Sequence, residues 1–131
     1  MTIRFPVSAI KPFVRQGLGC SCPDPVFEQV TSEWGEADGI GFRRLSAGGR
    51  WLVYLVATEP PGDLEARVMA LLRQGVRERN GEGFNRLRLV VVGELSGQDA
   101  DSLRERFAEE AGSDERLHLH TLSKAQVEHY Q

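Results

Sequence analysis

The longest helical pattern of apolar positions runs from Asp63 to about Arg79. Its apolar residues recur with the 3.6-residue period of a helix, and they are Leu64, Val68, Leu71, Leu72 and Val76. Asn80-Gly81 is expected to end this helix. Ser96 is expected to cap a second helix that ends at Gly112, and Ser123 with Gln126 predicts the capping box of a short last helix.

Two helices are also expected at the N-terminus. Ser8–Gln16 presents Ile10, Phe13 and Val14 on one face. A second helix is predicted to begin at the cysteines, with Pro23 and Pro25 in its first turn, and to end before Gly35. Residues 35–41 are rich in Gly, Glu and Asp and predict a loop.

Other apolar runs have the pattern of strands. Residues 42–46 and Trp51–Ala57 predict a hairpin around Gly48-Gly49. Because Trp51–Ala57 and Arg86–Gly93 are apolar almost throughout, both are expected to be covered on two faces. Leu117–Thr121 alternates apolar and polar residues, which predicts an edge strand.

The resulting order is α-α-β-β-α-β-α-β-α. It predicts an α/β fold with a mixed, mainly parallel four-stranded sheet and helices packed on its faces. We expect a single domain over 1–131, in which 1–34 is a helical segment carrying the cysteines and 41–131 is the sheet core. The strands 51–57 and 86–92 should be neighbours. The residues expected to be buried together are Leu55, Val68, Leu72, Leu89, Val91, Leu103 and Phe107.

Composition narrows the class of protein. A chain of 131 residues with 40% hydrophobic and 27% charged residues is typical of one globular domain. Its net charge of -3 argues against a nucleic-acid binder. The sequence shows no secretory leader, and its apolar runs are shorter than the about 20 residues of a membrane helix. We therefore expect a cytoplasmic protein whose two cysteines are in a reducing compartment.

Chemistry is concentrated in Gly19-Cys20-Ser21-Cys22-Pro23. Cys22 precedes the predicted second helix, and a helix N-terminus lowers the pKa of a thiol. Cys20 and Cys22 could therefore be catalytic thiols, since a disulfide closing so small a ring is expected to be strained and easily reduced. Two adjacent thiolates could instead bind a soft metal ion. The remaining alternative is that both are small buried residues.

His118 and His120 are a second candidate pair. Alternate residues of a strand share one face, so the two imidazoles could converge on a metal. With Cys20 and Cys22 they would complete a set of two Cys and two His, which suits zinc. A homodimer would instead bring four thiolates to its axis, which suits zinc or an iron–sulfur cluster. An exposed polar face of an edge strand explains the histidines equally well.

Two weaker candidates remain. The segments that follow the parallel strands carry Glu59, Asp63 and Glu94, which could bind a divalent ion, although such loops often contain acids as helix caps. The arginine-rich stretch from Arg73 to Arg88, with Phe84, could bind an anion or could be a solvated helix end.

The run from Gly17 to Glu28 resembles the N-terminal segment of small uncharacterised prokaryotic proteins that carry Gly-Cys-x-Cys-Pro before a Val-Phe pair. The resemblance covers about a dozen residues and implies that the motif is a site, with no activity attached. The sequence thus predicts a metal- or iron–sulfur-binding protein. The alternatives are a dithiol redox or thiol-relay protein and a non-enzymatic interaction domain with inert cysteines.

Overall fold

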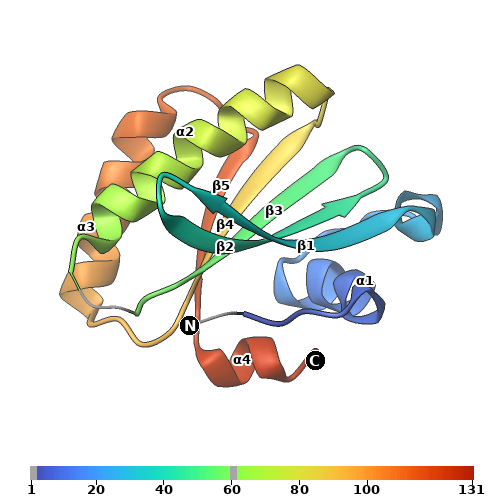
Figure 1. Cartoon of the computed structure of the whole chain (residues 1–131), viewed down its shortest axis with the longest axis horizontal. Coiled ribbons are helices and arrows are strands. Elements are labelled where there is room, and N and C mark those ends of the chain that lie inside the picture. The colour runs from blue at the N-terminus through green and yellow to red at the C-terminus, as the bar shows by residue number, and fades with distance from the viewer. Residues whose placement is uncertain (1–2, 60–61) are drawn as a thin grey trace.

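Five strands form one mixed sheet in the computed structural model, which describes residues 3–59 and 62–131 (Figure 1). In spatial order they are β1 (Val30–Ala37), β2 (Ile40–Ala47), β3 (Trp51–Ala57), β4 (Arg86–Val92) and β5 (Leu117–Leu122). The first three strands pair antiparallel, and β3, β4 and β5 pair parallel. The predicted α/β class with a mixed sheet is confirmed. The prediction of four strands, mainly parallel, is wrong.

The additional strand is β1, which occupies the region predicted to be a second helix. Only one 3-10 turn, η3 (Asp24–Glu28), forms after the cysteines. From Val30 onward, residues alternate between the two faces of the sheet, and Val30 and Trp34 pack against the N-terminal segment. Asp38 and Gly39 both have positive φ, 53° and 78°, and make the two-residue turn into β2. Residues 30–34 therefore belong to the sheet, and the predicted loop at 35–41 is a tight hairpin.

Two long helices cover one face of this sheet. α2 (Leu64–Glu82) and α3 (Gly97–Ala111) bury the predicted apolar stripe against β3 and β4. Ser96 accepts the Asp99 N–H at the start of α3, as its capping role predicts. α2 continues past Asn80-Gly81 and ends at Gly83, whose φ is +77° and whose N–H donates to the Arg79 carbonyl. The predicted end at Asn80-Gly81 is therefore wrong, because the helix is capped two residues later, at Gly83.

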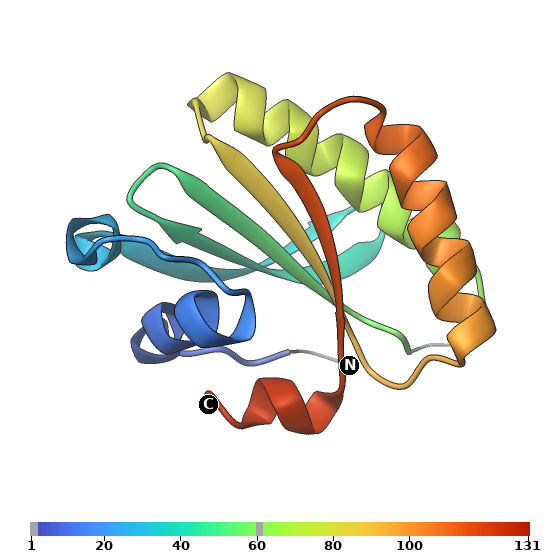
Figure 2. The ribbon, with the colours of Figure 1, turned by 180° about the vertical axis from the view of Figure 1, so that it is seen from behind.

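The opposite face is covered by short turns from both ends of the chain (Figure 2). The turns η1 (Val7–Ala9), α1 (Ile10–Pro12) and η2 (Phe13–Gly17) follow one another and confirm the first predicted helix. α4 (Lys124–Glu128) lies on the same side and has the predicted Ser123–Gln126 capping box. The Phe13 ring contacts those of Phe5 and Tyr130, with centroids 5.0 Å and 5.5 Å away, so the two chain ends are packed together.

The predicted core is confirmed with one correction. The strands β3 and β4 are neighbours, and all seven residues expected to be buried are buried. Leu55, however, faces the N-terminal segment, whereas the other six pack under α2 and α3. Successive residues of a strand point to opposite faces, so a strand that is buried throughout supplies two cores. Within residues 3–59 and 62–131, no helix is long and apolar enough to cross a membrane.

Candidate functional site: the Cys20–Cys22 turn

Cys20 and Cys22 lie in the turn between η2 and η3 and are joined by a disulfide, with their Cα atoms 5.3 Å apart. Gly19 has a φ of +72°, a conformation that favours glycine and allows the chain to turn sharply before the first cysteine. The Cys20 N–H donates to the Val14 carbonyl over 3.1 Å, which fixes the turn to the preceding helical segment. The Cys22 N–H points at Cys20 Sγ, 3.1 Å away.

The two cysteines differ in exposure. Cys22 is 8% exposed and belongs to the apolar cluster between the N-terminal segment and the sheet. Cys20 is only partly buried and lies at the border of the same cluster. Cys20 is therefore the cysteine that a second molecule reaches first, and Cys22 is the protected one.

Arg15 holds the turn from the side of η2. Its Nε and Nη2 atoms donate to the Cys22 carbonyl over 3.1 Å and 2.7 Å. The Nη2 atom also donates to Asp24 Oδ1 at 2.7 Å, and Lys11 Nζ lies 3.0 Å from the same oxygen. The hydrogen bond from Lys11 and then that from Arg15 lower the pKa of Asp24. Two cations therefore flank the segment that follows Cys22.

The sequence alone does not single out Arg15 and Lys11, although their four-residue spacing indicates a shared face of the first helix. Residues four apart on a helix lie on the same face, so the two side chains were available to one partner. Nothing in the sequence identified Asp24 as that partner, because the fold brings η3 back beside the first helical turns.

The predicted helix start at Cys22 is wrong. η3 is a 3-10 turn of five residues with Pro23 at its N-cap position, and Cys22 lies outside it. A turn this short has no macrodipole comparable to that of a long helix. The electrostatic influence on the sulfurs is instead local, through the single N–H group of Cys22 that faces Cys20.

His118 and His120 project from β5 on the face opposite α2 and α3, at the edge of the sheet as predicted. Their partners are arginines of β4: Arg86 Nη1 lies 3.3 Å from His118 Nε2, and Arg88 Nη1 lies 2.7 Å from His120 Nε2. Burial and then the charge of Arg88 lower the pKa of both histidines, that of His120 to about 4. In the described parts of the chain, no three His, Cys, Asp or Glu residues group as metal ligands, so these histidines and Cys20 and Cys22 do not form one set.

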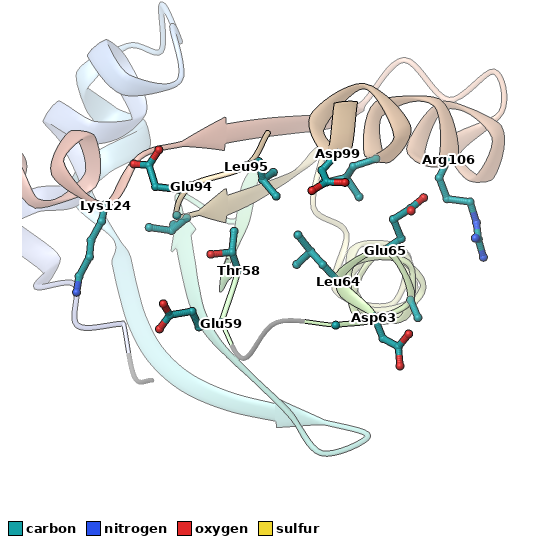
Figure 3. Close-up of a pocket in the computed structure, with 15 residues that line it drawn as sticks. Thr58, Glu59, Asp63, Leu64, Glu65, Glu94, Leu95, Asp99, Arg106 and Lys124 are labelled. Atoms are coloured by element: carbon teal, nitrogen blue, oxygen red, sulfur yellow. The ribbon is translucent and has the colours of Figure 1, made fainter. Parts of the chain in front are cut away.

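The predicted rim beyond the parallel strands contains a cavity of ≈ 790 Å³ (Figure 3). Glu59, Glu94 and Lys124 lie on one side of it, and Asp99 and Arg106 on the other. The three acids proposed from sequence, Glu59, Asp63 and Glu94, all line the cavity, but they do not group as metal ligands. Pro60 and Pro61 of this rim lie outside the described residues. The described lining residues of the cavity include both acids and cations, which favours no single charge for a ligand.

In the α2 part of the arginine-rich stretch, two of the three arginines are ion-paired. Arg73 pairs with Glu110 and Arg79 with Asp114, both at 2.6 Å. Phe84 is partly buried against the core beneath α2, and the Arg44 guanidinium lies 5.6 Å from its ring centroid and covers one face. For the α2 part of the stretch, this pairing favours a solvated helix end over an anion site. Arg86 and Arg88 lie on β4 and contact His118 and His120 instead.

Comparisons with known proteins give no relative from which a role could be transferred. No family model matches the chain, and neither a curated protein nor a solved structure matches it. The interpretation of the Cys20–Cys22 turn therefore rests on its own geometry.

Proposed function

We propose that the protein is a dithiol redox protein that exchanges disulfides through Cys20 and Cys22. The observation that supports this most strongly is that the two sulfurs are within bonding reach in one turn, one accessible and one buried. Disulfide exchange needs this asymmetry, because one sulfur must meet the substrate while the other resolves the mixed disulfide.

The exchange can be written with the substrate thiol as the only co-reactant. A substrate thiolate attacks Cys20 Sγ, the Cys20–Cys22 bond breaks, and Cys22 leaves as a thiolate and takes up a proton. A second substrate thiol then displaces Cys20 from the mixed disulfide. Two substrate thiols are oxidised to one disulfide, and the protein disulfide is reduced to a dithiol by the same two electrons and two protons. The reverse sequence reduces a substrate disulfide.

In the reducing direction Cys20 is the nucleophile. It is the more exposed cysteine, and the N–H of Cys22 faces its sulfur at 3.1 Å. A hydrogen bond to the charged form of a group stabilises that form, so this N–H favours the Cys20 thiolate. Cys22, 8% exposed, is protected from outside reagents and is placed to attack the mixed disulfide on Cys20.

Trapping of the mixed disulfide tests this assignment. Reduced Cys22→Ser should react with a chromogenic aromatic disulfide and retain a stable adduct on Cys20. Reduced Cys20→Ser is the matched control and should react about tenfold more slowly, the effect of about one unit in thiol pKa or of equivalent shielding. The wild-type protein should release two equivalents of chromophore and keep no adduct. Equal, slow reaction of both variants would mean that the cysteines are packing residues and that the protein is an interaction domain.

Metal or iron–sulfur binding by Cys20 and Cys22 is a second proposal that the same pair of thiols supports. A four-coordinate site needs two further ligands. Within the described residues none joins the two cysteines in a ligand group, so a second copy of the chain would have to supply them. Metal analysis of anaerobically purified protein separates the proposals: one metal or cluster per two chains favours the metal site, and metal-free protein with a reversible disulfide favours the redox dithiol.

A further inference from the structure

Four nitrogen-bearing side chains gather on the β4–β5 edge of the sheet, on the face opposite α2 and α3. Arg88 of β4 is the register partner of His118 of β5, and residues two apart on a strand share a face, so Arg86 and His120 join them. Arg86 is hydrogen-bonded to His118 and Arg88 to His120, each through Nη1 and Nε2. We refer to these four residues as the β4–β5 cationic cluster.

Neither arginine of this cluster has a carboxylate partner among the described residues. The ion pairs of the described chain involve other cations, such as Arg44 with Glu78 and Arg79 with Asp114. Asp114 is the carboxylate that acts on His118, and it already binds Arg79 at 2.6 Å. The cluster therefore carries two arginine charges without an acid to neutralise them.

These charges are partly removed from water. Arg88 Nε is buried and has no hydrogen-bond partner, and its guanidinium lies 4.6 Å from the centroid of the Trp51 ring. Burial and then the charge of Arg86 lower the pKa of Arg88. Because each histidine accepts an arginine N–H through Nε2, both rings are neutral in this arrangement. A half-buried cation with an unused hydrogen-bond donor destabilises the fold unless an anion neutralises its charge and accepts the hydrogen bond.

We propose that the β4–β5 cationic cluster binds a small phosphate-type oxyanion. Two adjacent guanidinium groups balance a dianion, whereas one carboxylate would neutralise only one of them. Arginine donors also match the several acceptor oxygens of a phosphate group. A nucleic-acid strand is disfavoured, because Trp51 is 8% exposed and already covered by Arg88, which leaves no aromatic face for a base. This inference does not depend on the thiol chemistry of Cys20 and Cys22.

The histidine rings provide a direct readout. We would titrate sodium phosphate into the full chain at neutral pH and constant ionic strength and follow the three imidazole rings by NMR. His118 and His120 should shift saturably, because they touch the two arginines. His129 is the internal control, since it follows α4 and its ring contacts Tyr130. Acetate at the same ionic strength should leave all three rings unchanged.

Substitutions then separate binding from general ionic effects. Arg88→Gln should weaken phosphate binding about 10- to 100-fold, which corresponds to the loss of one or two charge-assisted hydrogen bonds. Arg104→Gln is the matched control, because Arg104 is exposed and pairs with Asp101 three residues earlier. Equal shifts with acetate, or unchanged binding in Arg88→Gln, would overturn the proposal. The proposal would also be overturned if a single-stranded oligonucleotide bound more than tenfold tighter than phosphate, compared at equal concentrations of phosphate groups.

Discussion

The two faces of the sheet are covered in different ways, and the candidate site belongs to the less regular one. α2 and α3 cover the first face with 19 and 15 residues of continuous helix. The second face is covered by turns of three to five residues, held by the rings of Phe5, Phe13 and Tyr130 and by the side chain of Arg15. Both covers bury an apolar cluster, and the irregular one also places the Cys20–Cys22 pair in a turn whose shape depends on contacts distant in sequence.

The largest loss of stability is expected from a substitution in the core beneath α2 and α3. Leu72 of α2 is 1% exposed and packs against the sheet. Leu72→Ala should lower the free energy of unfolding by about 2–5 kcal/mol, because it leaves a cavity in that core. Urea denaturation measures this loss. A change below about 1 kcal/mol would contradict the placement of Leu72 in the core beneath α2.

A smaller effect is expected at the ion pair between α2 and the sheet. Arg44 Nε and Nη2 each lie 2.7 Å from Glu78 Oε2, and the Tyr54 hydroxyl donates to Glu78 Oε1 at 2.5 Å. Glu78→Gln keeps the shape but removes the charge, and should cost about 1–3 kcal/mol because Arg44 and Tyr54 lose a charged acceptor.

The pH dependence of stability provides the second readout for Glu78. Burial alone would raise its pKa, but the hydrogen bonds from Arg44 and Tyr54 and the charge of Arg44 lower it below the ordinary 4.5. A carboxyl whose folded pKa is depressed stabilises the fold above its unfolded pKa, and this contribution is lost as the pH falls. Wild type should therefore lose stability below about pH 4.5 more steeply than Glu78→Gln. Glu82→Gln, an exposed change in the same helix, should keep the wild-type slope.

The smallest predicted difference is in the stability of two glycine variants, and it tests how closely the N-terminal turns pack against the sheet. Gly48 and Gly49 form the β2–β3 turn with φ of +61° and +64°. A Cβ at Gly48 would lie 2.6 Å from the Val26 carbonyl oxygen of η3, whereas a Cβ at Gly49 would meet nothing within 4 Å. Both alanine variants should lose about 1 kcal/mol from backbone strain. Gly48→Ala should lose about 1–2 kcal/mol more from the collision.

Thermal or urea denaturation of the two glycine variants gives this difference directly. Equal losses in Gly48→Ala and Gly49→Ala would show that η3 does not rest against the hairpin. The N-terminal turns would then be a loose attachment to the sheet, and the burial of Cys22 would lose its structural basis.

Periodicity accounts for what the sequence predicted well. The stripe of α2 and the two-faced apolar runs of β3 and β4 are local patterns, and the structure confirms them. Val26, Phe27 and Val30 fit a helical spacing, which predicts a helix that reaches into the first half of β1. The Asp38-Gly39 turn that defines the hairpin lies in the segment predicted to be a loop. The partners of Arg15 and Arg88 could not be predicted, because they depend on how η3 folds back and on the register of β4 with β5.

A redox titration tests whether Cys20 and Cys22 form a reversible redox pair, as we propose. The full chain would be equilibrated in glutathione buffers of increasing reducing strength, then alkylated and weighed by mass spectrometry. We predict one reversible two-electron transition within a single chain, with a midpoint above the about −300 mV below which structural disulfides lie. A pair that stays fully oxidised at every buffer ratio, or that never forms the intramolecular bond, would show that the two cysteines are not a reversible redox pair.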